Sequence, residues 1–227
     1  MKRFARVVIL ILFGCFVPFY SFAQQTTAVS FSSTDGVPLS GHVFGTGKTG
    51  VILSHMYPTD QKSWFGFAKL LAGEGFIAMT FDFRGYGESG GSKDISKLDR
   101  DVEGAYLYLK PKADKIFLIG ASMGGPASII VATRQPTAGV VSLGGPMSFK
   151  GLDAEKAIAR LKSPGLFISS EEDGKGRFAA AARSFYQQAQ GKKELIIFPG
   201  GAHGTRLFDS PHKEQVEKKI LEFLRGS

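Results

Sequence analysis

Short, continuously apolar runs separated by helical stretches constrain the fold of this chain more than any other feature. A half-exposed strand alternates apolar and polar residues, whereas a strand covered on both faces is apolar throughout. Runs of the second kind lie at residues 50–54, 76–81, 116–119, 140–143, 166–168 and 195–198. They predict the buried strands of a parallel sheet with helices on both faces.

The segments between these runs have the length and periodicity of helices, at residues 63–72, 95–110, 125–134, 154–161, 177–189 and 214–224. The segment 125–134 is nearly all apolar, which predicts a central helix. Ahead of the first buried run, residues 29–32 and 39–43 alternate around Asp35-Gly36, a pattern typical of an antiparallel hairpin. The expected fold class is α/β, with a mostly parallel sheet of about eight strands that starts with this hairpin.

The first residues have the layout of an export signal. Lys2, Arg3 and Arg6 precede an apolar run at 7–20, and Ser21 and Ala23 stand at −3 and −1 of a cleavage site before Gln24. The run holds about 14 residues, fewer than the roughly 20 that a membrane-spanning helix needs. We therefore expect residues 1–23 to be a cleaved signal peptide and residues 24–227 to form one secreted or periplasmic domain, with no stable membrane insertion.

The single cysteine, Cys15, offers a minor alternative. Leu12-Phe13-Gly14-Cys15 loosely resembles a bacterial lipobox, which would attach a lipid to Cys15. Phe13 is bulkier than that motif usually accepts, and apolar residues continue to Tyr20. A retained membrane anchor is the other alternative. Cleavage after Ala23 leaves no cysteine, so the mature domain would have no disulfide.

Charge does not point to a nucleic-acid partner. The net charge is +8, and removal of Lys2, Arg3 and Arg6 leaves 25 basic and 20 acidic residues, a net charge of +5. The basic residues are dispersed, as in Lys192-Lys193, and are not interleaved with aromatic side chains. This distribution favours a solvated surface, with at most a mild attraction to anionic surfaces. No pattern indicates an oligomeric state.

Gly120-Ala121-Ser122-Met123-Gly124 follows a buried run directly and precedes the central helix. This is G-x-S-x-G in a strand–turn–helix context, where a sharp turn strains the serine and side chains at the glycines would strike neighbouring backbone. Ser122 is therefore the candidate nucleophile. The alternative is a glycine-rich turn that serves only close packing of helix on strand.

In this context the chain resembles the α/β-hydrolase family from about residue 31 to 224, and especially its small dienelactone-hydrolase-like and serine-esterase-like members. Residues 81–89, FDFRGYGES, resemble the D-x-R-G-x-G-x-S loop of those proteins. The resemblance implies a three-layer sandwich and a structural role for this loop, with Arg84 bonded to buried carbonyls. Residues 145–162 are too few for a large lid, although Phe149 and the helix at 154–161 can rim a pocket.

A serine hydroxyl needs a base to remove its proton. His203 lies in a glycine-rich loop after the last strand, where the family carries its catalytic histidine. His42 is interpreted as an ordinary histidine of the early hairpin, His55 as a structural residue before the oxyanion loop, and His212 as a solvated helix cap.

The base in turn needs an acid that orients it. Asp173, a few residues past the strand at 166–168, best matches the position of the family's acid. Glu172 and Glu171 are the alternatives, and an acidic helix cap is the non-catalytic interpretation. The order Ser122, Asp173, His203 is the order in which this fold presents its triad.

The developing oxyanion needs preorganised donors. The backbone N–H of Met123 is the first candidate, and the resemblance points to Tyr57 for the second. The family usually has glycine where this chain has Met56, so Met56 stays an alternative donor. The Tyr57 hydroxyl is a weaker possibility.

A serine at this position indicates acyl transfer through an acyl-enzyme, with a small-molecule acyl substrate and water as the usual acceptor. No metal-ligand set or nucleotide-binding loop is present in the sequence, so we expect no cofactor. The leading hypothesis is a carboxylesterase. The alternatives are another acyl-transfer enzyme (thioesterase, peptidase or acyltransferase) and a non-catalytic binding protein of the same fold.

Overall fold

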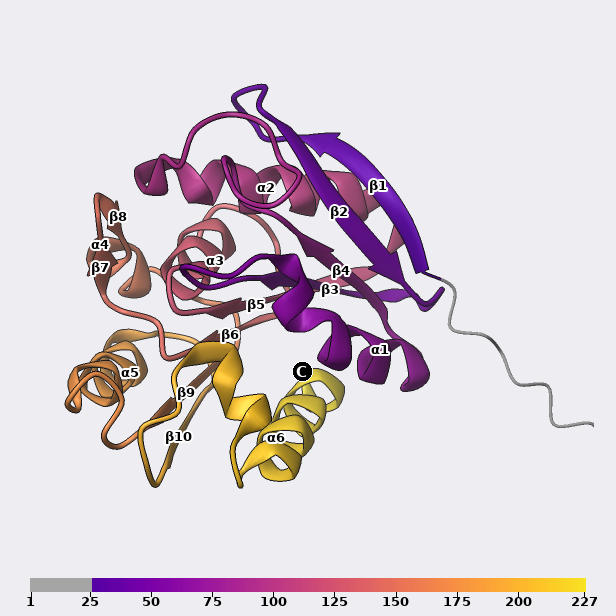
Figure 1. The fold of residues 1–227 in the computed structure, drawn as a ribbon. Coiled ribbons are helices and arrows are strands. Elements are labelled where there is room, and N and C mark those ends of the chain that lie inside the picture. Colours follow the sequence, from indigo (N-terminus) through magenta and orange to yellow (C-terminus); the bar gives the residue numbers. More distant parts are fainter. Residues whose placement is uncertain (1–25) are drawn as a thin grey trace, which may run out of the picture.

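Figure 1 shows the fold in a computed structural model that describes residues 26–227. The predicted signal peptide and the alternative lipid site at Cys15 lie outside the described residues. The main sheet contains eight strands, in the order β1-β2-β4-β3-β5-β6-β9-β10. These are β1 Thr26–Ser32, β2 Pro38–Phe44, β3 Thr49–Ser54, β4 Ile77–Phe81, β5 Lys115–Ala121, β6 Gly139–Leu143, β9 Gly165–Ser170 and β10 Lys193–Phe198.

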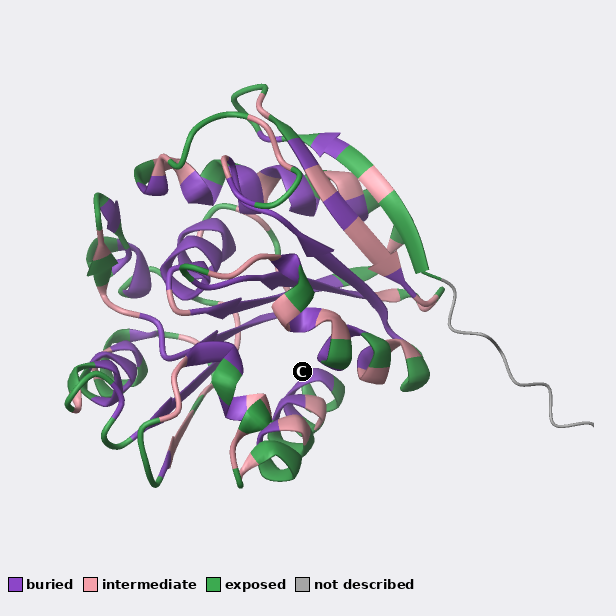
Figure 2. Cartoon of the chain, in the orientation of Figure 1, coloured by how far each residue is buried: buried purple, intermediate pink, exposed green. Residues whose placement is uncertain are grey.

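Strand directions match the apolar pattern. Six neighbouring strands of the main sheet pair in parallel, namely β4, β3, β5, β6, β9 and β10, and each contains one of the continuously apolar runs. The alternating segments form β1 and β2, which pair antiparallel with each other, and β2 pairs antiparallel with β4. Figure 2 shows the central strands buried and the outer strand β1 largely exposed. The predicted fold class is therefore confirmed.

Helices cover both faces of the sheet because neighbouring strand residues point to opposite sides. On one face, α2 (Leu98–Leu109), α3 (Gly124–Ala132) and α5 (Arg177–Gln188) pack on Ile52, Leu118 and Phe167. On the other, α1 (Phe65–Gly73) and α6 (Lys213–Gly226) pack on strand residues that include Leu53 and Ile119. Every residue of α3 is buried, as its composition predicts. Within residues 26–227 no helix is both long and apolar enough to cross a membrane.

The segment between β6 and β9 differs from the prediction. The helix expected at 154–161 is a single turn, α4 (Glu155–Ile158), and a small hairpin of β7 (Ser148–Phe149) and β8 (Leu152–Asp153) precedes it. Lys150 and Gly151 join the two strands with φ of +47° and +88°. Positive φ at both positions is what a two-residue hairpin turn of type I′ requires, and Lys-Gly is a weak sequence signal for it.

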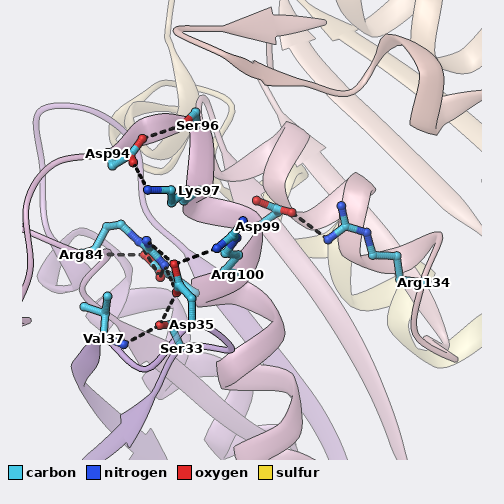
Figure 3. A network of polar contacts seen from close by, with 11 residues as sticks. Ser33, Asp35, Val37, Arg84, Asp94, Ser96, Lys97, Asp99, Arg100 and Arg134 are labelled. Atoms are coloured by element: carbon cyan, nitrogen blue, oxygen red, sulfur yellow. Dashed lines mark hydrogen bonds and ion pairs between the residues drawn. The ribbon is translucent and has the colours of Figure 1, made fainter.

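The loop after β4, residues 82–89, is held by charge pairs. The expectation that Arg84 bonds buried carbonyls is wrong, because its guanidinium binds two carboxylates (Figure 3). Arg84 donates from Nε and Nη2 to Asp101 Oδ1 at 2.9 and 2.6 Å, and from Nη1 and Nη2 to Asp35 at 3.0 and 2.6 Å. The backbone N–H of Arg84 also donates to Asp101. These bonds tie the β1–β2 hairpin to α2 through the loop.

A second buried carboxylate, Asp82, closes the same loop. It accepts hydrogen bonds from the backbone and side-chain amides of Gln61 and from the backbone of Glu88. A Cβ on Gly87 would lie 2.1 Å from Asp82 Oδ2, so only glycine fits there. Gln61 begins the short helix η1 (Gln61–Trp64), which leads into α1, and Asp82 thereby fixes the segment that follows β3.

Candidate active site

Ser122 occupies a strained turn between β5 and α3. Its φ is +48°, in the left-handed region that residues other than glycine seldom adopt. A Cβ on Gly120 would lie 2.0 Å from Gly124 O, and one on Gly124 would lie 2.4 Å from Ser54 O. Both glycines are therefore required by close backbone approach, as the spacing of the motif predicts. The turn leaves the Ser122 side chain partly exposed while its neighbours are buried.

Asp173 and His203 come together from the ends of β9 and β10. His203 Nδ1 lies 2.7 Å from Asp173 Oδ2, and the aspartate side chain is only 3% exposed. Because an ionised carboxylate only accepts hydrogen bonds, His203 must carry its proton on Nδ1. This tautomer leaves Nε2 as the basic nitrogen, which is the arrangement that a general base requires.

The loop of His203 lies over the serine turn. A Cβ on Gly204, the next residue, would lie 3.4 Å from Ala121 Cβ and 3.7 Å from the backbone nitrogen of Ser122. Within residues 26–227 the Ser122 hydroxyl makes no hydrogen bond, to His203 or to any other group. Catalytic hydrogen bonds are often loose in the absence of substrate and tighten when it binds.

The two backbone N–H groups that the sequence suggests as oxyanion donors also lack a protein partner. Those of Met123 and Tyr57 donate no hydrogen bond within the described part of the chain. The Met56 carbonyl accepts from Thr59 N, Thr59 Oγ1 and His55 Nδ1, and these bonds fix the Met56–Tyr57 peptide plane. Since N–H and C=O point in opposite directions in a trans peptide, the Tyr57 N–H faces away from this turn.

His55 is buried and structural. The backbone N–H of Phe83 donates to its Nε2 at 3.1 Å, so the proton lies on Nδ1, which donates to Met56 O at 3.0 Å. Burial lowers the pKa of His55. The bond from Phe83 N–H to Nε2 requires the neutral ring, because a protonated imidazole has no acceptor nitrogen. His55 thus links the turn at Met56 to the loop after β4.

A cleft of about 440 Å³ opens beside Ser122. Its apolar wall includes Met147 and Phe149 from the β7–β8 segment and Phe178 and Ala181 from α5. The Phe178 ring lies against the His203 ring, with centroids 4.3 Å apart. Arg177 is the charged residue on this wall. A second cleft, of about 500 Å³, lies between α1 and the segment after His203; Met56 and Thr205 line it, and Ser122 does not.

The other candidates lie outside this constellation. Glu171 pairs with Arg183 on the surface, and Glu172 is exposed. His42 bonds Gln61 through Nδ1. His212 is at the N-cap position of α6 but makes no capping hydrogen bond and stacks on Phe198 instead. Within residues 26–227 no three His, Cys, Asp or Glu side chains gather in the way a metal ion requires.

Sequence reasoning missed Gly144, Arg177 and Phe178. A Cβ on Gly144 would lie 3.0 Å from Asp173 Oδ2 and 3.1 Å from His203 Nδ1, so a side chain there would press on the pair. The signal for Gly144 was its position directly after a buried strand. Arg177 and Phe178 carry no such signal, because only the path of the turn before α5 places them on the cleft.

Several solved structures share the fold. An esterase from Pyrococcus furiosus superimposes with a TM-score of 0.77 at 20% identity, over 89% of this chain and 91% of that one. A dienelactone hydrolase from Anabaena variabilis gives 0.74 at 23% identity, over 89% and 98%. An esterase from Thermogutta terrifontis gives 0.72 at 19% identity, over 88% and 98%. At these identities the likeness concerns the fold.

Sequence relatives are distant. The uncharacterised Escherichia coli protein YfhR is 21% identical over 87% of this chain and 80% of that protein. The Caenorhabditis elegans α/β hydrolase domain-containing protein aho-3 is 26% identical over 63% of this chain, and the match spans 48% of that protein. The family model described as alpha/beta hydrolase fold matches residues 50–191. That segment contains β3 to α5, including the serine turn, and the chain belongs to the α/β-hydrolase fold family.

Proposed function

We propose that this protein is a serine hydrolase that cleaves carboxylic esters through an acyl-serine intermediate on Ser122. The observation that carries the proposal is the Asp173–His203 contact of 2.7 Å above a strained serine turn at the mouth of a cleft. A serine hydrolase needs a strained, accessible serine, an oriented imidazole and free N–H donors.

In the proposed acylation step, His203 Nε2 removes the Ser122 hydroxyl proton while Oγ bonds to the ester carbonyl carbon. The carbonyl oxygen becomes an oxyanion, which the N–H groups of Met123 and Tyr57 stabilise, with Met56 as the alternative to Tyr57. The protonated His203 then gives its proton to the alcohol oxygen. The C–O bond breaks, the alcohol leaves and the acyl group stays on Ser122.

Deacylation repeats these steps with water. His203 Nε2 takes a proton from water, whose oxygen attacks the acyl carbon, and the protonated ring returns the proton to Ser122 Oγ as the acid leaves. Asp173 stays ionised, holds the ring and stabilises its cationic form.

A fluorophosphonate probe tests the proposal directly, because it labels only an activated serine. We expect wild-type protein to be labelled on Ser122 and Ser122→Ala to show no labelling, with folding checked by circular dichroism. Labelling at another residue would contradict the assignment, and a folded wild type without labelling would favour a non-catalytic binding protein. A panel of p-nitrophenyl esters, acyl thioesters and aminoacyl anilides then separates an esterase from a thioesterase or peptidase, and added alcohol acceptors reveal an acyltransferase.

We also propose that the enzyme is exported and that its mature domain starts at Gln24. The support is the charged start, the apolar run and the Ser21-Phe22-Ala23 cleavage site. Intact-mass measurement of exported protein should give residues 24–227. A mass corresponding to a lipid-modified Cys15 terminus would contradict this and favour the lipoprotein alternative.

A further inference from the structure

Arg177 is an unpaired cation on the wall of the cleft beside Ser122. Most arginines of the described chain are in ion pairs, namely Arg84, Arg100, Arg134, Arg183 and Arg225. Arg177 forms no ion pair and no hydrogen bond within residues 26–227. Glu171, an acidic residue of the turn before α5, is paired with Arg183 instead.

Arg177 is exposed, and two contacts define the path of its side chain. Its guanidinium carbon lies 4.6 Å from the centre of the Phe178 ring, and the same ring lies against His203. A Cβ on Gly174 would lie 2.7 Å from Arg177 Nε, so the arginine side chain crosses a turn that glycine leaves open. Stacking on an aromatic face lowers the entropy that the side chain would lose on binding a ligand.

The charge pattern at the start of α5 does not explain an arginine at this position. Arg177 is the first residue of α5, and the first turn contains no acidic residue. The positive end of the helix dipole disfavours a cation there. The stack on Phe178 offsets part of this cost, and proteins break such local preferences mainly at functional sites.

From these observations, and resting on the proposed function, we propose that the cleft binds esters that carry a carboxylate, which pairs with Arg177. Guanidinium and carboxylate have matching planar geometries and can form two parallel hydrogen bonds. Lys150, a second cation that forms no ion pair within the described part of the chain, is near the same site. Its Nζ lies 5.4 Å from the Tyr57 ring and 5.6 Å from that of Phe149, which lines the cleft. The apolar wall would then contact the chain between ester and carboxylate.

Matched substrates test this pairing. p-Nitrophenyl hemiglutarate carries a carboxylate on the acyl part, 3-acetoxybenzoate carries one on the alcohol part, and p-nitrophenyl butyrate and phenyl acetate are their neutral counterparts. The quantity compared is kcat/KM for the anionic ester divided by kcat/KM for its neutral counterpart. For one of the two pairs we expect Arg177→Gln to lower this ratio by about tenfold, mostly because KM for the anionic ester rises. The pair that responds identifies the part of the ester that lies in the cleft. Added salt should lower the same ratio in the wild type.

Arg183→Gln is the matched control, because it removes the same charge from the same helix outside the cleft. It should leave the ratio unchanged. The proposal is overturned if Arg177→Gln leaves both ratios unchanged, or if Arg183→Gln lowers them equally. In the first case Arg177 has no charge-specific role, and in the second the effect comes from overall charge.

A binding measurement separates this inference from the proposed function. Ser122→Ala protein should be titrated calorimetrically with two anionic esters, monomethyl glutarate and 3-acetoxybenzoate. We expect it to bind one of them. The same titration on the Ser122→Ala, Arg177→Gln double variant should show about tenfold weaker binding. If wild type is labelled by fluorophosphonate but Ser122→Ala binds neither anion, the carboxylate proposal fails and the hydrolase proposal stands. If Ser122→Ala binds one of the anions through Arg177 but wild type cleaves no ester, the hydrolase proposal fails and the carboxylate site stands.

Discussion

Two loops at the carboxyl ends of parallel strands in the main sheet, β4 and β5, use polar residues in opposite ways. In the loop after β4, residues 82–89, the carboxylate of Asp82 and the guanidinium of Arg84 are both buried and fully engaged by protein groups. At the serine turn after β5, residues 120–124, the Ser122 hydroxyl and the Met123 N–H have no partner within residues 26–227. The first loop pairs its buried charges with protein groups, whereas the second leaves these two polar groups without a partner.

The difference indicates what each loop contributes. Buried charges that lose a partner destabilise the fold strongly, so the loop after β4 should matter for stability. A hydroxyl at a cleft and an N–H without a partner add little to stability. Substitutions in the two loops should therefore separate stability from activity, and the following experiments test that separation.

The largest effect should come from the serine turn. We expect Ser122→Ala and His203→Ala each to lower kcat by about 10⁴- to 10⁶-fold, and the double variant to be hardly worse, because the two groups act as one unit. The strain of the turn lies in its backbone, so Ser122→Ala should leave the urea midpoint unchanged. Steady-state kinetics and urea unfolding measure the two quantities. Single losses that multiply in the double variant would contradict the triad.

Asp173→Asn should lower kcat by about 10²- to 10⁴-fold, because an amide no longer stabilises the protonated His203 ring. Glu172→Gln is the matched control, since it makes the same kind of change one residue away on an exposed side chain. It should leave kcat within about twofold of wild type. The opposite ranking of these two variants would move the acid to Glu172.

The same contrast explains what could be predicted from the sequence. The strands, their directions and the central helix follow from apolar runs that report burial directly, and the glycines of the serine turn follow from backbone contact. The partners of Arg84 could not be predicted, because Asp35 and Asp101 are far from it in the sequence and meet it only through the packing of the hairpin on α2.

The rim of the cleft was the least predictable region. The hairpin at 148–153 turns at Lys150-Gly151. The sequence pattern predicted only the helix at 154–161 in this region and gave no clear signal for the hairpin. The stack of Arg177, Phe178 and His203 depends on the conformation of a glycine turn that no apolar pattern encodes. Each of the three triad candidates lies within five residues of the end of a strand, which the apolar runs indicate, whereas the cleft beside Ser122 has no such signal in the sequence.

In the loop after β4, Arg84→Leu should lower the free energy of unfolding by about 3–5 kcal/mol, because it leaves the buried Asp101 carboxylate without its partner. Arg100→Leu is the matched control. Arg100 also contacts Asp35, at 3.1 Å, but its side chain is 47% exposed, so its loss should cost no more than about 1 kcal/mol. Urea unfolding measures both. Equal losses in the two variants would mean that the buried network does not stabilise the hairpin.

The smallest expected effect is a pH dependence of that network. Hydrogen bonds from Arg84 hold the pKa of Asp35 well below its usual range, against the opposing effect of burial. A carboxyl whose pKa is lowered by folding stabilises the protein above its unfolded pKa, about 3.9, and loses that contribution as pH falls through the folded value. The stability advantage of wild type over Asp35→Asn should therefore be constant from pH 7 to about 5 and shrink below about pH 4.

Burial raises the pKa of Asp101, which acts in the opposite sense, but this contribution is present in both proteins and largely cancels in the difference. Asp94→Asn is the control. The hydrogen bond from Lys97 also lowers the pKa of Asp94, but the pair is exposed and solvent screens it, so the pH dependence should be smaller than for Asp35→Asn. Urea midpoints at intervals from pH 7 to 3 provide the measurement, and an advantage that grows as pH falls would show that Asp35 is not held ionised by Arg84.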